Sequence, residues 1–375
     1  MFGIGAGMMI EEQMARAQAR PLRLTAYTDS TTRGGAEQSA ATLLAHLDKR
    51  IEVTVLGVEA EVVEWFAAQR PGTEPRLVPQ VRNKFDLGPI YAHIRAVRDL
   101  RPHIFQANLP TTFSCQYGIL AALLAPGVSV VVVEHSPIES ASGLQRFLKR
   151  TLSRRLGAHL SIGMSSARAA ERAIGLREGS IRTIYNGVAA PAAEPTYEQH
   201  EPPIIGSLGR LSPEKGYDVL VRALASLDGV RLVLVGDGPE RADLLALAQD
   251  LGVADRLEIT GWKVNARDYL GGFDVFVLPS RFEGLPLSVI EAMLAGLPVV
   301  ATNVGSLSEA VLDDETGLLI PPGDPAALAE ALRSLLDDPE RRRRMGERGL
   351  RFAHERFTIE AMVRSYESLY EELQP

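Results

Sequence analysis

Short apolar runs and helical repeats of apolar positions alternate along the first half of the chain. Residues 128–133 form a nearly continuous β-branched run, as in strands that are buried on both faces of a sheet. Elsewhere apolar residues recur at the three- and four-residue spacing of helices that cover a sheet. The predicted strands are residues 22–27, 51–58, 76–81, 103–107 and 128–134, and the predicted helices are residues 36–47, 59–69 and 111–124. This alternation predicts a doubly wound parallel sheet.

The pattern stops between Asn186 and Pro203 and then begins again. Asn186-Gly187 is a turn signal, and four prolines interrupt a polar stretch without periodicity. The second series has predicted strands at 204–209, 231–236, 257–261, 275–279 and 298–302, helices at 216–227, 241–251 and 287–295, and a tail from Pro325 that is nearly all helix with breaks near 337–339 and 357–358. We therefore predict an extension (1–20), a first domain (21–190), a linker (191–203) and a second domain (204–357), with ligands bound in a cleft at the strand C-terminal ends.

Composition excludes several classes of protein. With 46% apolar and 23% charged residues, the chain is neither disordered nor fibrous. The single cysteine, Cys115, cannot form an internal disulfide or a Cys-rich metal site, which favours a reducing, cytoplasmic setting. No apolar run reaches the roughly 18 residues that span a bilayer, and the opening segment lacks the basic leader of a signal peptide.

Charge is distributed unevenly between the two halves. The net charge of −7 argues against nucleic-acid binding, yet residues 1–190 carry 22 Lys and Arg against 16 Asp and Glu. We expect the basic half to contact something negative. Residues 143–156 form a basic amphipathic stretch, with Leu144, Phe147, Leu148, Leu152 and Leu156 on one helical face. This stretch has two interpretations. It can make a peripheral contact with an anionic lipid acceptor or with the inner face of an anionic membrane. Alternatively, it is a helix whose apolar face packs on the core and whose basic face is solvated.

The most informative segment is residues 281–300, RFEGLPLSVIEAMLAGLPVV. Glu283 lies in a loop after a predicted strand, Gly284 permits close backbone approach, and Pro286 suits the first turn of the helix that follows. The free N–H groups of that turn suit an anion such as phosphate, and Glu291 can accept hydrogen bonds from sugar hydroxyls. The alternative is two solvated glutamates beside an ordinary helix.

A second segment, Gly209 to Gly216, follows the first strand of the second series. Its Arg210 offers a bidentate fork and its Lys215 a point charge, which together can neutralise a diphosphate. The alternative is that both are simply solvated.

Two weaker candidates come from the first half. Gly34-Gly35 forms a strand-to-helix turn that can cradle a phosphate, and His135 at the end of a buried strand can donate to a hydroxyl or carbonyl. A tight turn and a structural histidine explain these residues nearly as well.

Several other chemistries are excluded by motif. The segment Gly236-x-Gly238-x-x-Arg241 lacks the third glycine of the dinucleotide fingerprint. The chain has no phosphate-loop, nucleophile-elbow or zinc-protease motif, and no Asp-x-Asp pair to hold a metal against a diphosphate. We therefore expect no metal and no cofactor, with the diphosphate neutralised by Arg210, Lys215 and the helix start.

With these residues placed, the chain resembles the family 4 glycosyltransferases, whose GT-B fold has two Rossmann-like domains facing across a cleft. The likeness covers about residues 22–370 and includes NVGSLSE at 303–309, ETGLLIPPGD at 315–324 and IYNGV at 184–188. Glu283 and Glu291 fit the family's Glu-x7-Glu motif. Many relatives have a second glycine where this chain has Ser306.

The resemblance implies roles for individual residues. Arg210 and Lys215 would bind the donor diphosphate, Glu291 the ribose, and Glu283 the transferred sugar. The remaining implied donor contacts are Gly34 and Gly35 at the phosphate, His135 at the sugar, the loop positions Gly209, Gly284, Leu285, Pro286 and Leu287, and backbone near Val264 at the base. A C-terminal helix, about 358–375, would cross back to the first domain.

We therefore expect a retaining, metal-independent glycosyltransferase of cell-envelope glycans. Its donor would be a UDP- or GDP-linked hexose or N-acetylhexosamine, and its acceptor a glycan, lipid or small molecule. Two alternatives stay open: a GT-B nucleotide-sugar epimerase or hydrolase, and a non-catalytic subunit that binds nucleotide sugars.

Overall fold

The computed structural model describes residues 21–111, 114–135, 143–191, 195 and 199–374. The chain divides into two compact units. The first comprises the residues up to Val133, Arg154–Ala158 and the chain from Glu367 onward, and the second comprises Glu134–Ser153 and His159–Tyr366. The predicted domain boundaries stay predictions.

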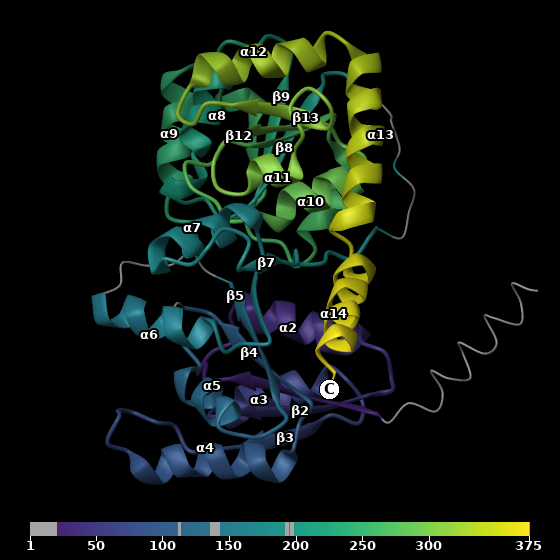
Figure 1. Cartoon of the computed structure of the whole chain (residues 1–375). Coiled ribbons are helices and arrows are strands. Elements are labelled where there is room, and N and C mark those ends of the chain that lie inside the picture. The colour runs from purple at the N-terminus through teal and green to yellow at the C-terminus, as the bar shows by residue number, and fades with distance from the viewer. Residues whose placement is uncertain (1–20, 112–113, 136–142, 192–194, 196–198, 375) are drawn as a thin grey trace, which may run out of the picture. The chain divides into compact units, whose positions relative to one another are not determined.

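A parallel sheet with the strand order β3-β2-β1-β4-β5 forms the centre of the first unit (Figure 1). Its strands are β1 (Leu22–Thr28), β2 (Ile51–Gly57), β3 (Glu74–Leu77), β4 (Ile104–Leu109) and β5 (Ser129–Glu134). The helices between them are α2 (Gly35–His46), α3 (Ala60–Ala68), α4 (Leu87–Leu100) and α5 (Gln116–Leu123). One face of the sheet buries Tyr27, Phe105 and Val130 against apolar residues of α4 and α5. Leu24, Ile104 and Val131 on the opposite face are buried as well, and burial of both faces explains the continuous apolar strands.

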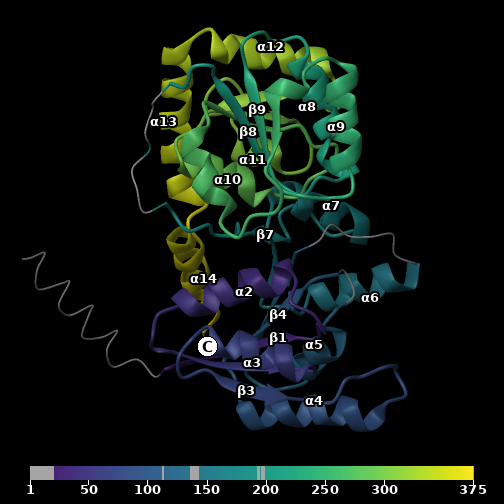
Figure 2. The same cartoon turned by 180° about the vertical axis from the view of Figure 1, so that it is seen from behind.

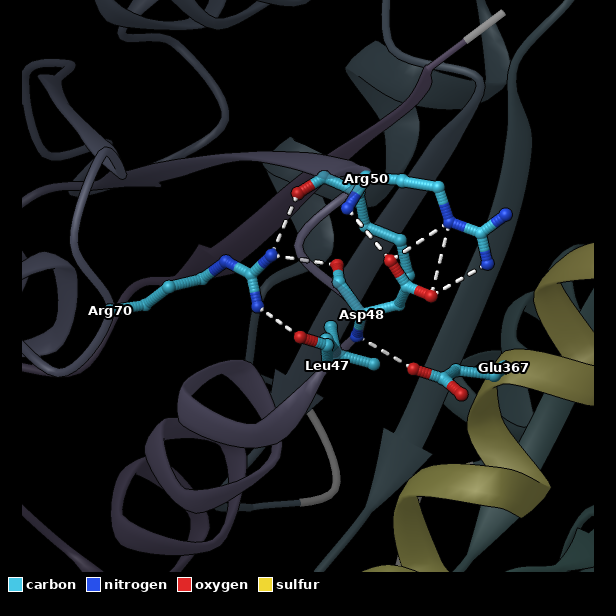
Figure 3. Close-up of polar contacts among 6 residues, drawn as sticks. Leu47, Asp48, Arg50, Arg70 and Glu367 are labelled. Carbon is cyan, nitrogen blue, oxygen red and sulfur yellow. Dashed lines mark hydrogen bonds and ion pairs between the residues drawn. The ribbon is translucent and has the colours of Figure 1, made fainter. Parts of the chain in front are cut away.

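The connection from α2 to β2 is held by a buried arginine (Figure 3). The Arg70 guanidinium donates hydrogen bonds to the backbone carbonyls of Leu44, Leu47, Asp48 and Ile51. The carbonyls that end a helix have no partner within it, so a side-chain cation satisfies them and matches the negative end of the helix dipole. These hydrogen bonds fix the chain where it enters β2, at the end of the sheet where the parallel strands begin.

The C-terminal end of the chain also belongs to the first unit. In α14 (Ile359–Leu373), Glu367 accepts the Asp48 N–H at 2.7 Å, and the Tyr370 hydroxyl donates to Gln106 Oε1 at 2.5 Å. The Ser129 hydroxyl donates to the Leu373 carbonyl at 3.0 Å. These bonds tie the last turns of α14 to β4, β5 and the start of β2.

The second unit is built on a six-stranded parallel sheet of order β10-β9-β8-β11-β12-β13 (Figures 1 and 2). The strands are β8 (Ile204–Leu208), β9 (Arg231–Val235), β10 (Leu257–Ile259), β11 (Val275–Leu278), β12 (Val299–Thr302) and β13 (Gly317–Ile320). The chain moves outward from β8 in one direction and then returns to add β11 on the other side. Such a reversal is the place where doubly wound sheets bind their ligands.

Alternating strand residues build a core on each face of this sheet. Leu232, Leu234 and Val275 pack with apolar residues of α8 (Tyr217–Leu224), α9 (Arg241–Asp250) and α12 (Pro325–Leu336). Val233 and Phe276, which point the opposite way, pack with α10 (Leu287–Leu294) and the end of α13 (Pro339–Arg356). The second unit also contains α6 (Gly143–Ser153), α7 (Met164–Ile174), α11 (Leu307–Ala310), β7 (Arg182–Thr183) and the residues of β6 (Ala158–Ser161) that follow Ala158.

The predicted breaks in the C-terminal tail are confirmed, and one predicted helix is corrected. Helix α12 ends at Leu336, α13 spans Pro339–Arg356, and α14 begins at Ile359. The helix expected over 111–124 begins only at Gln116, because Cys115 has a φ of 63° and its N–H donates to the Asp29 carboxylate at 2.6 Å. A contact with a residue 86 positions away therefore sets that helix start. None of the described helices has both the length and the apolar character needed to cross a bilayer.

Candidate functional site

Two loops leave the second sheet at its reversal point and bring a cation and a carboxylate together. Lys215 ends the short helix η1 (Pro213–Lys215) after β8, and Glu283 lies in the loop after β11. Lys215 Nζ is 2.5 Å from Glu283 Oε1, and the Ser280 hydroxyl donates to the same oxygen at 2.7 Å. The two side chains are 22% and 10% exposed, so both reach solvent. Tertiary structure thus joins two residues that the sequence predicted from separate segments.

The loop that carries Glu283 is fastened to the segment that carries Lys215. The Arg281 guanidinium forms a bidentate pair with Asp218 at 2.8 and 2.7 Å, and the Arg281 N–H donates to the Glu214 carbonyl at 2.7 Å. This pairing lowers the pKa of Asp218. Gly216 has a φ of +67°, and a Cβ there would lie 2.3 Å from the Pro279 carbonyl oxygen. Sequence reasoning missed the Arg281–Asp218 pair, since nothing in the spacing links α8 to this loop.

The other side of the same loop rests on the chain after β12. Gly305 has a φ of +57°, and a Cβ there would lie 1.9 Å from the Glu283 carbonyl oxygen. The Ser306 N–H donates to the Gly284 carbonyl at 3.0 Å. A Cβ on Gly284 would meet no atom within 4 Å. Gly284 therefore faces open space, and the close backbone approach of a ligand there stays a prediction.

Helix α10 starts beside this loop with an exposed first turn. The helix begins at Leu287, which is 43% exposed, and Pro286 is the N-cap residue. Pro286 was expected within the first turn and lies one position earlier, where its ring cannot cap the helix with a side-chain hydrogen bond. Leu285, just before it, is partly buried. The positive end of the helix dipole is thus not matched by an N-cap side chain.

Glu291 lies on the second turn of α10 and pairs with a cation that the sequence did not single out. Arg267 Nε donates to Glu291 Oε1 at 2.7 Å, with side-chain exposures of 50% and 14%. Arg267 comes from the 3₁₀ helix η3 (Ala266–Gly272) after β10. Arg267 therefore orients the Glu291 carboxylate.

Three further predicted residues lie on loops of the second unit. Arg210 is exposed at the end of β8. A Cβ on the preceding Gly209 would lie 2.6 Å from the Tyr217 hydroxyl, so packing alone requires a glycine there. Val264 is 81% exposed in the loop after β10, and Trp262 beside it is 73% exposed. An exposed tryptophan is a candidate for a stacking contact, and sequence reasoning passed over it.

Gly34 and Gly35 belong to the first unit. Gly34 is the N-cap of α2, and its N–H donates to the Glu37 carboxylate at 3.1 Å, which also accepts from the Thr28 hydroxyl at 3.1 Å. A Cβ on Gly35 would meet no atom within 4 Å. The turn is capped internally, and Gly35 leaves open space at the helix start.

His135 follows β5 and is kept neutral by burial. Its Nε2 is buried without a hydrogen-bond partner among the described residues, and desolvation lowers its pKa to about 4. The adjacent Glu134 is occupied elsewhere: Lys149 Nζ lies 2.6 Å and His159 Nε2 3.0 Å from its Oε1. His135 thus lies directly after the C-terminal end of β5, and its predicted contact with a ligand stays a prediction.

Burial of this neutral imidazole predicts a pH-dependent stability. The unfolded side chain takes up a proton near its ordinary pKa of 6.5, whereas the folded one does so only near 4. The free energy of unfolding should therefore rise with pH between about 4 and 6.5. Above pH 6.5 the contribution of His135 to this free energy should no longer change with pH. Urea unfolding across this range should show a shallower rise for His135→Gln. Equal slopes for the two proteins would contradict the buried neutral state.

No set of three or more His, Cys, Asp or Glu side chains suited to hold a metal occurs in the part of the chain that the structure describes. This observation does not test metal independence, which stays a prediction.

The fold and site define a protein of two Rossmann-like α/β domains with the GT-B architecture, and comparisons with known proteins agree. Residues 192–352 match the family described as glycosyl transferases group 1, and residues 33–190 match glycosyltransferase family 4. LpsE of Rhizobium meliloti (strain 1021), a lipopolysaccharide core biosynthesis glycosyltransferase, is 38% identical over 44% of this chain and 48% of its own length. The N-acetyl-α-D-glucosaminyl L-malate synthase of Bacillus anthracis is 37% identical over 37% of each chain. These matches support a relationship between this chain and glycosyltransferases of the family 4 type.

The structural likeness extends over nearly the whole chain. HepE of Anabaena, solved in complex with UDP, superposes with a TM-score of 0.79 at 20% identity over 94% of this chain and 100% of its own. The lipopolysaccharide outer core galactosyltransferase WaaB gives a TM-score of 0.74 at 17% identity over 93% of this chain and 99% of its own. At these identities the likeness establishes the fold. The match to LpsE spans about half the length of that relative, so the activity of the whole protein is a proposal.

Proposed function

We propose that this protein is a retaining glycosyltransferase that moves a sugar from a nucleotide-diphosphate sugar to a hydroxyl acceptor. The observation that supports this most is the Lys215–Glu283 pair at the reversal point of the second sheet, beside the exposed start of α10. A cation next to a helix N-terminus suits a diphosphate, and a carboxylate at the same point suits a sugar hydroxyl.

The ion pair between the Lys215 ammonium and the Glu283 carboxylate is the contact that a donor would rearrange. A donor diphosphate would compete for Lys215, which releases the Glu283 carboxylate to accept hydrogen bonds from the transferred sugar. As the glycosidic bond breaks, negative charge grows on the diphosphate, where Lys215, the exposed Arg210 and the α10 dipole stabilise it. The acceptor oxygen would bond to the anomeric carbon on the face that the diphosphate leaves, and the departing diphosphate oxygen would take the acceptor proton. Attack on that face retains the configuration.

The choice of donors to test follows from the relatives. HepE of Anabaena has been solved with UDP and with UDP-glucose, and a Mycobacterium tuberculosis relative, 40% identical over 41% of this chain, is described as a GDP-mannose-dependent mannosyltransferase. UDP- and GDP-linked hexoses and N-acetylhexosamines are therefore the first donors to test.

The experiment is a thermal-shift screen over these donors, followed by product analysis with and without acceptor extracts. A bound donor stabilises the folded state by mass action, so one nucleotide series should raise the melting temperature. Transfer to acceptor supports the proposal. A changed sugar still attached to nucleotide would indicate an epimerase, free sugar a hydrolase, and binding without turnover a non-catalytic subunit. No stabilisation by any UDP-, GDP- or ADP-sugar would overturn it.

We propose in addition that α6 contacts an anionic membrane surface. Phe147 is 64% and Leu148 50% exposed, so these two residues do not face a core, while the adjacent Lys149 turns inward to Glu134. The side chain of Leu144 lies outside the described residues. Exposed Arg146 and Arg150 flank the apolar pair, an arrangement typical of helices that lie on anionic lipid.

We expect the protein to sediment with phosphatidylglycerol vesicles in a salt-sensitive way and only weakly with phosphatidylcholine vesicles. The double variant Phe147→Ser/Leu148→Ser should lose most of this binding. Leu245→Ser, which removes a 39% exposed leucine on α9, should bind as the wild type does. Equal sedimentation of all three proteins would contradict the contact through α6.

A further inference from the structure

A buried carboxylate from α11 caps a helix far away in the sequence. Glu309 is 7% exposed. Its Oε2 accepts the N–H of Met164 at 2.6 Å and the Tyr185 hydroxyl at 3.0 Å, and its Oε1 accepts the N–H of Ser165 at 2.6 Å. Burial alone would raise the pKa of Glu309, but the hydrogen bonds from Ser165 and Met164 lower it. The carboxylate is therefore ionised at neutral pH and held at three points.

Helix α7 depends on this distant partner because it lacks a cap of its own. Its N-cap residue is Gly163, which has no side chain to receive the first N–H groups. A Cβ on Gly163 would lie 2.6 Å from the Ser306 hydroxyl oxygen. Gly163 therefore provides no side-chain cap, but because it has no Cβ the segment 305–309 can approach the start of α7. A negative charge is favourable at that helix end.

The opposite side of segment 305–309 contacts the loop of the candidate site. Gly305 lies against the Glu283 carbonyl, and the Ser306 N–H donates to the Gly284 carbonyl at 3.0 Å. One short segment therefore bonds to the first turn of α7 through Glu309 and to the Gly284 carbonyl through the Ser306 N–H, and it packs against the Glu283 carbonyl at Gly305. Both contacts lie within the second unit.

We propose that Glu309 is a positioning residue for the transfer reaction, which fixes segment 305–309 against α7 and thereby sets the place of the Glu283–Gly284 backbone relative to Lys215. The inference rests on the proposed function, in which Glu283 contacts the transferred sugar. A small displacement of this backbone would move the carboxylate away from the sugar without touching any donor-binding side chain.

Glu309→Gln keeps the size of the side chain and one acceptor oxygen but turns an NH₂ group toward a backbone N–H. Because a misplacement of about 1 Å can cost on the order of a hundredfold in rate, kcat/KM for the donor should fall about 10- to 100-fold. The matched control is Asp324→Asn. Asp324 caps α12 by accepting the N–H groups of Ala326 and Ala327, both at 3.0 Å, and should change kcat/KM less than about twofold.

A mutant cycle and amide exchange distinguish positioning from simple helix capping. If Glu309 acts through Glu283, the double variant with Glu283→Gln should be no slower than Glu283→Gln alone. In Glu309→Gln the Ser306 amide, which is bonded to Gly284, should exchange about tenfold faster, beyond the expected loss of protection at Met164 and Ser165.

Three results would each overturn the inference. The first is that the losses of kcat/KM in the two single variants multiply in the double variant. The second is an unchanged exchange rate of the Ser306 amide, and the third is an equal effect of Glu309→Gln and Asp324→Asn on kcat/KM. A wild-type protein inactive with every donor would refute the proposed function instead. The amide exchange would then still decide whether Glu309 sets the position of the loop.

Discussion

Replacement of Lys215 by alanine should lower kcat/KM for the sugar donor by about 10²- to 10³-fold, the usual loss for removing one group that stabilises developing charge. Two effects combine. The leaving diphosphate would lose a cation proposed to bind it, and Glu283, only 10% exposed, loses the ammonium 2.5 Å away. The measurement is steady-state kinetics with the donor found by screening, together with UDP or GDP affinity by calorimetry.

Glu283→Gln gives a different pattern that tests the same site. Its kcat should fall by a similar factor, because the amide cannot provide the negative charge proposed to contact the sugar. Nucleotide affinity should be retained or rise, since Lys215 is released from its ion pair and becomes available to the diphosphate. Lys215→Ala should weaken nucleotide binding as well as turnover. If Lys215 and Glu283 belong to one donor site, Lys215→Ala should lower the affinity for UDP or GDP, whereas Glu283→Gln should leave it unchanged or raise it.

The matched control is Arg231→Ala. Arg231 also pairs with a carboxylate in the second unit, Glu258, at 3.1 Å, but both side chains are about half exposed at 45% and 52%. This exposed pair should matter little for activity or stability. Wild-type kinetics in Lys215→Ala, or an equal loss in Arg231→Ala, would remove the proposed donor site.

Gly305→Ala should abolish most activity and destabilise the second unit. The new Cβ would lie 1.9 Å from the Glu283 carbonyl oxygen, at a φ of +57° where an L-residue is strained. The left-handed conformation costs about 1–2 kcal/mol and the overlap about 1–3 kcal/mol more, so the free energy of unfolding should fall by about 2–5 kcal/mol. The Glu283 loop must move to accept the methyl group.

Gly323→Ala separates backbone strain from the clash. Gly323 has a φ of +76°, yet a Cβ there would meet no atom within 4 Å. It should lose only the about 1–2 kcal/mol of the left-handed conformation and keep its kcat/KM. Urea unfolding and donor kinetics on both variants provide the comparison. Similar activity in the two variants would show that the Gly305 contact does not position Glu283.

Much of the fold follows from the sequence because its signals are local. The β-branched run that became β5 and the breaks before α13 and α14 depend on residues close in the chain. The start of α5 does not depend on residues close in the chain, because it is set by the hydrogen bond from the Cys115 N–H to Asp29, 86 residues away. Pro286 shows the same limit on a smaller scale: its ring predicts a helix start, and only the backbone decides that the first helical residue is Leu287.

The sequence by itself determined two α/β series, a cationic segment after the first strand of the second series and a Glu-x7-Glu segment further on. It could do so because strand and helix periodicity and turn chemistry act over a few residues. Only the tertiary structure decided that Lys215 pairs with Glu283, that Arg267 orients Glu291, and that Glu309 caps α7. These contacts depend on strand order, which places the carboxyl ends of β8 and β11 side by side although the sequence separates them by about seventy residues.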